Sequence, residues 1–297
     1  MYKQQKQECR VKPVFSYMKE SLRFFDLDNP FVDKIIFVLI LAVIFGGYLF
    51  ARPYIENAFL YYEQINVNLM EQIEAKSLDF SAIDNETAMK FFESMLNVMA
   101  IYAVIKAVAY ILATYYGVFY YYSLTNPDTS WDQRTVLFLK KLIKLIIFNI
   151  LFYGIFALGI FIIFVLTLLI SLFIPLIILI LPLLPIAVLV VDILFIFKNL
   201  LIIEFDTGIF KNFKVALDIT RGCKKRVVIN GLWPHFLGLI LNSLAIDVQH
   251  PNLALFFIAF CEALILLIFQ RLTALMFIDA ASVERKDKVP EKHKDMY

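Results

Sequence analysis

The chain alternates long apolar runs with short polar segments, and six of the runs are long enough to cross a bilayer. A hydrocarbon core of about 30 Å needs roughly 20 apolar residues in a helix. The pattern therefore predicts an all-α, polytopic integral membrane protein with six transmembrane helices. The predicted spans cover residues 31–52, 95–122, 145–173, 176–201, 228–246 and 253–278.

The third and fourth spans come from one uninterrupted stretch, 145–191, that contains no charged residue. As a single helix it would be about 70 Å long, more than twice the hydrocarbon thickness, so it must turn back. Pro175 is the expected turning point, because proline breaks the helical hydrogen-bond ladder. Pro182 and Pro185 then predict a kinked or locally unwound fourth span.

Composition supports the membrane interpretation, since only 18% of the residues are charged, against roughly 25% in ordinary globular proteins. Lysine and arginine are also unevenly placed. Seven lie in 1–34, four in 124–144, seven in 198–226 and five beyond 279, whereas the opposite side of a six-span arrangement holds only Arg52, Lys76 and Lys90. The positive-inside rule therefore predicts cytoplasmic N and C termini, the latter in a disordered tail over 280–297. The abundance of Ile, Phe, Lys and Leu indicates a low-GC bacterium, and the expected location is the plasma membrane.

Amphipathic segments precede the hairpins of predicted spans. Phe15, Met18, Leu22 and Phe25 recur at helical spacing before the first span, and Asn29 is the expected cap of that span. Ser130 and Gln133 form a capping-box pattern before the third. With a third segment near 210, the chain reads as repeat-like units 14–122, 130–203 and 207–279. Each predicts one cytoplasmic interfacial helix and one membrane hairpin.

The third amphipathic segment, FKNFKVALDITRGCKKRVV (210–228), is strongly basic. Lys211, Lys214, Asp218, Arg221 and Lys225 share one helical stripe, and Phe210, Phe213, Leu217 and Thr220 share its neighbour, with Gly222 as the expected C-cap. This pattern is typical of a helix lying in the membrane interface. The residues expected to face anionic headgroups are Lys211, Lys214, Arg221, Lys224, Lys225 and Arg226. A regulatory or partner-binding helix is an alternative, whereas tethering between two spans argues against nucleic acid.

Residues 201–232, LIIEFDTGIFKNFKVALDITRGCKKRVVINGL, resemble the membrane domain fused to some bacterial glycerophosphodiester phosphodiesterases and its stand-alone polytopic relatives. In that domain an apolar helix leads through a short turn to a second helix and then to a span. Ala216-Leu217, Thr220 in place of the usual serine, and Gly222 match the pattern. The resemblance covers about a tenth of the chain. It implies a polytopic module without the soluble phosphodiesterase barrel, and so no particular reaction.

The first outer loop, 53–94, is acidic and carries a helical apolar pattern. Asp84 is positioned to cap a helix leading into the second span. We therefore expect the first two spans to extend outside the membrane as a helical hairpin. This hairpin is either a solvated extension or a docking surface for a partner.

Four charged residues lie well inside predicted spans, away from the span ends: Lys106, Asp192, Glu262 and Arg271. At 1.5 Å per residue, Lys106 and Glu262 lie at similar depth, and Asp192 and Arg271 lie together closer to the cytoplasm. This predicts the ion pairs Lys106–Glu262 and Asp192–Arg271. Such pairs either fix helix packing or line a polar pathway for an ion, proton or substrate, while Arg271 has the further option of reaching the cytoplasmic surface.

Other chemistry-bearing residues show no catalytic or metal-binding pattern. Cys9, Cys223 and Cys261 lie far apart, which favours reduced, unpaired thiols. None of the three histidines has a metal-ligand partner at a suitable spacing, and no cofactor motif is present. The tyrosines over 115–122 fit an aromatic belt at the cytoplasmic interface.

These patterns favour a non-enzymatic, permease-like or transport-associated membrane protein that contacts anionic headgroups and works with a partner membrane or ATPase subunit. Two alternatives remain open. One is a membrane scaffold or homeostasis protein that binds a partner through its acidic outer hairpin. The other is a lipid-handling membrane enzyme, which would require a cluster of catalytic groups at one interface.

Overall fold

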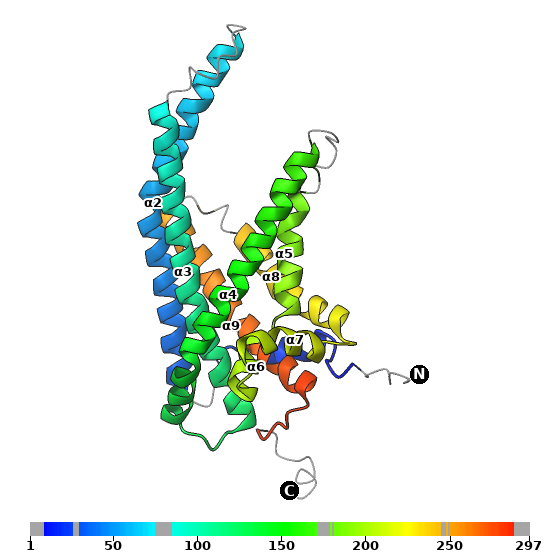
Figure 1. Cartoon of the computed structure of the whole chain (residues 1–297). Helices are drawn as coiled ribbons and strands as arrows, with labels where there is room; N and C mark the ends of the chain where they lie inside the picture. Colours follow the sequence, from blue (N-terminus) through cyan, green and yellow to red (C-terminus); the bar gives the residue numbers. More distant parts are fainter. Residues whose placement is uncertain are drawn as a thin grey trace, which may run out of the picture. The chain divides into compact units, whose positions relative to one another are not determined.

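A computed structural model describes residues 9–25, 30–74, 85–171, 179, 181–244, 248 and 250–287 (Figure 1). Within these residues the chain is helical, with turns and no strand, as the apolar pattern predicts. The helices are α1 Phe15–Ser21, α2 Pro30–Glu74, α3 Asn85–Thr125, α4 Trp131–Ser171, α5 Leu184–Leu194, α6 Lys198–Phe205, α7 Ile209–Ile219, α8 Lys224–Ser243 and α9 Pro251–Ala281. Pro175, Asp84 and Asn29, predicted to turn or cap helices, lie outside the described residues, as does most of the 280–297 tail.

Five helical segments of the described chain are long and apolar enough to cross a membrane. They are Phe31–Met70, Asn85–Thr125, Trp131–Ser171, Leu181–Phe205 and Pro251–Ala281, and they contain or overlap predicted spans one to four and six. The predicted fifth span, 228–246, corresponds to α8, which is 20 residues long and is not among the five. Asn230, Pro234 and His235 in its middle lower its hydropathy.

The chain divides into two compact units, which are described separately. Unit 2 contains residues 34–113 and 238–266, and it consists mainly of α2, α3 and the first half of α9. In Figure 1, α2 and α3 run side by side in opposite directions, in blue and cyan. Gly47 of α2 packs directly against the side chain of Ile105 of α3. Further along, the rings of Tyr62 and Phe91 lie 6.3 Å apart.

The predicted hairpin extension over 53–94 is helical wherever the structure describes it, because α2 continues to Glu74 and α3 begins at Asn85. At 1.5 Å per residue, α2 and α3 are each more than 60 Å long, about twice the hydrocarbon thickness. Half of each helix therefore lies beyond the span that a bilayer requires. The side of the membrane on which it lies stays a prediction.

Unit 1 contains residues 1–33, 114–237 and 267–297, and it joins segments from the whole length of the chain. The Asn230 amide in α8 donates to the carbonyl of Lys12 at 2.9 Å. The Tyr17 hydroxyl in α1 donates to Asp279, near the end of α9, at 2.6 Å. The backbone N–H of Lys286 donates to Leu124 O, at the end of α3. The start of α8 and the ends of α3 and α9 therefore share one region with the N-terminal segment.

The three predicted interfacial helices form in different ways. The first is α1, whose Phe15 is 81% exposed and whose following Phe25 is 62% exposed, as expected for a lipid-facing surface. The second is not separate, because α4 runs without interruption from Trp131 to Ser171. Its capping box is confirmed, since Ser130 and Gln133 exchange backbone-to-side-chain hydrogen bonds of 3.2 and 3.4 Å. The third is α7, described below.

The tyrosines of α3 lie mostly in the core of unit 1 rather than in an aromatic belt. Tyr116, Tyr120 and Tyr121 are at most 2% exposed. The Tyr116 hydroxyl donates to the carbonyl of Phe24, and that of Tyr120 donates to Glu20. The belt interpretation was wrong because the N-terminal segment before α2 packs over this part of α3 and provides hydrogen-bond acceptors for the hydroxyl groups.

Candidate functional site

The predicted ion pair between Lys106 and Glu262 is present in unit 2. Lys106 Nζ on α3 contacts Glu262 Oε1 on α9, and the Glu262 side chain is only 17% exposed. Tyr48 of α2 donates its hydroxyl to the other carboxylate oxygen at 2.5 Å. The ammonium also lies 4.7 Å from the ring centroid of Tyr102. Both charges are therefore compensated within three apolar helices.

The second predicted pair, Asp192–Arg271, is wrong. Asp192 of α5 instead accepts a charged hydrogen bond from Lys198 Nζ at 2.5 Å. The Lys198 side chain is 3% exposed and that of Asp192 is 30% exposed. Tyr153 of α4 contributes its hydroxyl to both partners, at 3.2 Å from Asp192 and 3.1 Å from Lys198.

Arg271 has a different environment, in which it is buried at 3% exposure. Its guanidinium donates to the backbone carbonyl of Arg23 and lies 3.9 Å above the ring of Tyr120. This contact joins α9 to the N-terminal segment through backbone and aromatic groups. It also overturns the alternative in which Arg271 reaches the cytoplasmic surface.

A break in the fourth span brings Lys198 to Asp192. Helix α5 ends at Leu194, Phe195 leaves the helical region with φ −100° and ψ 20°, and α6 starts at Lys198. No proline lies at this break. The prolines expected to kink the span lie earlier, Pro182 in a short 3₁₀ turn and Pro185 in the first turn of α5, where proline is tolerated.

Amide side chains extend the polar contacts around Lys198. Asn149 of α4 donates to Asn199 of α6 at 3.0 Å, and Asn199 lies 3.5 Å from the Thr114 hydroxyl of α3. Asn212 of α7, which is fully buried, donates to the backbone carbonyl of Lys198 at 2.8 Å. Four helices of unit 1 are thus connected at the break in the fourth span. Nothing in the charge pattern pointed to these uncharged residues.

Helix α7 is the predicted interfacial helix, and it is shorter than expected. It ends at Ile219, and Gly222 adopts φ 81° in the following turn, close to its predicted capping role. Its buried face carries Asn212, Ala216 and Thr220, whereas Phe210 is 82% exposed. The helix therefore rests on the protein through small and polar side chains and leaves an aromatic side chain outward, as an interfacial helix requires.

The six basic residues expected at anionic headgroups divide into two groups. Lys211 and Lys214 on α7, Arg221 in the turn, and Lys224 and Lys225 at the start of α8 are all exposed. Arg226 is exposed as well, but its guanidinium donates to the carbonyl of Val11 at 2.9 Å. It therefore also has a structural role in holding the N-terminal segment.

Two lysines before the third span bind a carboxylate that sequence reasoning did not single out. Lys141 and Lys144 of α4 contact Asp206 at 2.6 and 2.7 Å. Asp206 ends α6 in a left-handed conformation with φ 48°, which is uncommon outside glycine. Hydrogen bonds from the two lysines lower the pKa of Asp206 to about 2. The one sequence feature that could have predicted this contact is the acidic residue in the Asp206-Thr207-Gly208 turn.

Cys9 and Cys223 form a disulfide across 214 residues of sequence, so the expectation of unpaired thiols was wrong for this pair. Cys261 is the free cysteine and is buried. The bond attaches the N-terminal segment to the turn before α8. Disulfides are rare in the reducing cytosol. This bond therefore favours an oxidising compartment for this region, whereas the predicted orientation places the same region in the cytosol.

Among the side chains that the structure describes, no group of three or more His, Cys, Asp or Glu residues is arranged to hold a metal ion. Within the described residues, the chemistry that the structure presents consists of compensated ion pairs, amide contacts and a basic helix whose charged side chains are exposed. Comparison with protein-family models, with characterised proteins and with solved structures yields no match.

Proposed function

We propose that this chain is a non-enzymatic, permease-like or transport-associated protein of a bacterial plasma membrane. The observation that carries the proposal is the broken fourth span with the Asp192–Lys198 pair at the break. Ionisable groups in apolar helices are costly and are often functional, and transporter sites commonly use discontinuous helices. Tyr153, which contacts both charges, gives this site a hydroxyl able to exchange hydrogen bonds with a passing solute or water.

The contacts within unit 1 support six crossings. The start of α8 and the end of α9 both contact the N-terminal region, through Asn230–Lys12 and Tyr17–Asp279. Helix α9 is long and apolar enough to span, and the proposal places its two ends on opposite sides of the membrane. Residues between 230 and 251 must then cross, and the 20 residues of α8 cover about 30 Å. Under this arrangement both termini lie on the side that carries most of the lysines and arginines.

A thiol-accessibility experiment tests the transport proposal. Tyr153→Cys, in a background without the native cysteines, is exposed to a charged, membrane-impermeant thiol reagent on intact cells and on inverted vesicles. Leu158→Cys is the control, since Leu158 lies on the same helix and is 60% exposed. The proposal expects modification of Tyr153→Cys but not of Leu158→Cys, because only a hydrated cavity admits the reagent. An unreactive Tyr153→Cys in both preparations contradicts it.

One observation favours a scaffold as the second candidate. The half of the α2–α3 hairpin beyond residue 58 exposes large apolar side chains beside its glutamates. Exposed fractions are 69% for Phe59, 64% for Met70, 73% for Met89 and 69% for Phe92. Solvated helices rarely keep so many, so a partner would cover them. Affinity purification in mild detergent separates the two functions: an accompanying ATPase supports transport, and an accompanying outer-surface protein supports the scaffold.

A further inference from the structure

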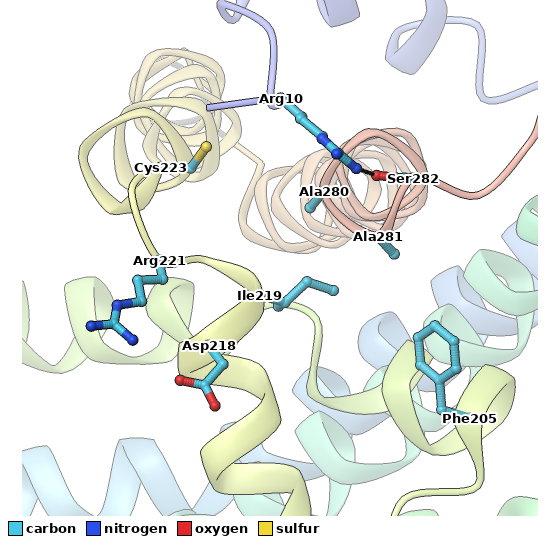
Figure 2. A pocket seen from close by; sticks show the side chains of 9 residues that line it. All are labelled: Arg10, Phe205, Asp218, Ile219, Arg221, Cys223, Ala280, Ala281 and Ser282. Carbon is cyan, nitrogen blue, oxygen red and sulfur yellow. Dashed lines mark hydrogen bonds between the residues drawn. The ribbon is translucent and has the colours of Figure 1, made fainter. Parts of the chain in front are cut away.

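The N-terminal strap, residues 9–14 ahead of α1, passes between the start of α8 and the end of α9 in unit 1 (Figure 2). Cys9 is bonded to Cys223, the residue before α8. The Arg10 guanidinium donates to the hydroxyl of Ser282, just after α9. Arg10, Cys223 and Ser282 all line a cavity of about 300 Å³, so the strap forms part of its wall.

Hydrogen bonds also hold the strap on α8. The Arg226 guanidinium donates to the Val11 carbonyl at 2.9 Å, and the Val11 side chain is fully buried. The Asn230 amide, one helical turn further along, donates to the Lys12 carbonyl at 2.9 Å. None of these contacts requires the sulfur–sulfur bond. They therefore raise the effective concentration of each thiol at the other when the bond is open.

The surroundings of the two cysteines favour the thiolate, which is the form that exchanges with disulfides. Cys223 directly precedes α8, and the free backbone N–H groups at a helix N-terminus attract negative charge. Arg10 follows Cys9, and Asp218, an acidic residue of the cavity wall, points away from Arg10 in Figure 2. The basic residues closest to Cys223 in sequence are Arg221, Lys224, Lys225 and Arg226.

A disulfide in this region is compatible with the predicted cytosolic side only if it is reversible. The same basic residues assign the region to the cytosol by the positive-inside rule. Disulfides that form in a reducing cytosol are usually transient and catalytic or redox-sensing. Cys261 is free and buried in unit 2, so it takes no part in this chemistry.

We propose that Cys9 and Cys223 form a reversible redox clamp, which a low-molecular-weight disulfide such as oxidised glutathione closes over the cavity. The Cys9 side is half-buried, whereas Cys223 is 6% exposed, so the Cys9 thiolate attacks first. The bond of the small disulfide breaks, and one thiol leaves. The Cys223 thiolate then attacks the Cys9 sulfur, the protein disulfide forms, and the second thiol leaves.

Electrons and protons balance in this exchange. The two cysteines together lose two electrons and two protons, and the small disulfide takes them up to become two thiols. An excess of reduced thiol reverses both steps and leaves the strap held by hydrogen bonds alone. The proposal rests on the cytoplasmic orientation and is independent of transport.

The first test equilibrates the purified full chain in dodecyl maltoside with reduced and oxidised glutathione at varied ratios. After an acid quench, the unfolded chain is alkylated with a polyethylene-glycol maleimide, which shifts the gel band once per free thiol. The oxidised chain should give one shift, from Cys261, and the reduced chain three. The pair should be mostly reduced at a cytosolic ratio and mostly oxidised at the ratio of an oxidising compartment. A bond that stays closed, or thiols that stay open, at every ratio would overturn the proposal.

Variants of α8 test whether the strap contacts hold the thiols together. The titration midpoint is the ratio of squared reduced to oxidised glutathione at half oxidation. Arg226→Gln removes the hydrogen bond to Val11 and should lower this ratio by about fivefold, because the effective concentration falls. Lys225→Gln removes the same charge at an exposed neighbouring position and should change it by less than about twofold. Equal shifts would show that charge alone sets the equilibrium and would overturn the clamp.

Hydrogen exchange followed by mass spectrometry measures closure of the wild-type strap. Peptides covering residues 10–14 should exchange at least about fivefold more slowly in the oxidised chain, because the disulfide and the strap contacts stabilise each other reciprocally. Peptides from 85–100, in unit 2, should exchange equally in both states. Equal exchange of the strap in both states contradicts the clamp.

The thiol state in cells tests the orientation on which the clamp rests. When growing cells are acidified rapidly and then alkylated, the pair should be mostly reduced. A pair that is reversible in detergent but oxidised in such cells would overturn the cytosolic placement, and with it the regulatory role. Labelling of Tyr153→Cys tests transport separately, so failure of one proposal is distinguishable from failure of the other.

Discussion

Replacing Asp192 or Lys198 singly should lower stability by different amounts, because the two side chains differ in burial. Asp192→Leu leaves an ammonium that is 3% exposed. Removing one partner of a buried pair costs about 3–5 kcal/mol. The rings of Phe152 and Tyr153, centred 4.3 and 4.8 Å from Lys198 Nζ, return about 1 kcal/mol through cation–π attraction. We therefore expect Asp192→Leu to lower the free energy of unfolding by about 2–4 kcal/mol.

Lys198→Met leaves the Asp192 carboxylate without its cation, but at a position that is more exposed to solvent than that of Lys198. Asp192 is 30% exposed and keeps the Tyr153 hydroxyl at 3.2 Å, so the expected loss is about 1–2 kcal/mol. The double variant should lie within about 1 kcal/mol of the wild type, because replacing a buried ion pair by apolar side chains is often neutral. The resulting coupling energy is about 2 kcal/mol or more.

The assay is equilibrium unfolding in mixed dodecyl maltoside and dodecyl sulfate micelles, followed by far-ultraviolet circular dichroism. Glu86→Leu and Lys90→Met form the matched control pair on α3. These partners are 2.5 Å apart, but their side chains are 72% and 48% exposed, so a coupling of only about 0.3–0.5 kcal/mol is expected. A double variant at 192 and 198 that is no more stable than Asp192→Leu would refute the reasoning.

Two further predictions follow from particular contacts. Asp206→Asn should abolish a pH-dependent part of stability: the lysines lower the pKa of Asp206 from 3.8 to about 2, so its contribution is complete above about pH 4 and disappears as the pH falls through 2. Lowering the pH across that range should reduce the thermal unfolding midpoint of the wild type more than that of the variant. Midpoints that fall in parallel with pH would contradict this prediction. Gly231→Ala should destabilise by about 1–3 kcal/mol, because a Cβ there overlaps Ile193, whereas Gly154→Ala on α4 meets open space and should be neutral or stabilising. Equal midpoints in a thermal unfolding series would contradict this difference.

Helical architecture and one of the two ion pairs could be predicted from sequence because both depend on regular geometry. Apolar runs of bilayer length indicate spans directly. Lys106 and Glu262 lie in uninterrupted helices, α3 and α9, so counting 1.5 Å per residue places them at the same depth. The same counting failed for Asp192, because its span breaks after Leu194. The break brings the Lys198 side chain next to the Asp192 carboxylate, although the charge pattern assigns Lys198 to the cytoplasmic segment.

Other contacts were beyond prediction because their partners have no pattern in one sequence. Arg271 binds a backbone carbonyl, and every residue offers one. Cys9 and Cys223 are 214 residues apart, and only the packing of the N-terminal segment against α8 brings them together. Asn149 and Asn199 are uncharged, so the charge pattern does not distinguish them from their apolar neighbours, although they connect α4 to α6.

The central claim is that the chain crosses a bilayer an even number of times with both ends on the cytoplasmic side. Single cysteines at Glu63, on the hairpin predicted to lie outside, and at Glu284, beyond α9, test it in a background without the native cysteines. Both side chains are exposed in the structure. With a membrane-impermeant thiol reagent on intact cells, Glu63→Cys should be labelled, and Glu284→Cys should be labelled only after permeabilisation. Labelling of Glu284→Cys on intact cells would contradict the account, because it would place the segment after α9 outside the cell.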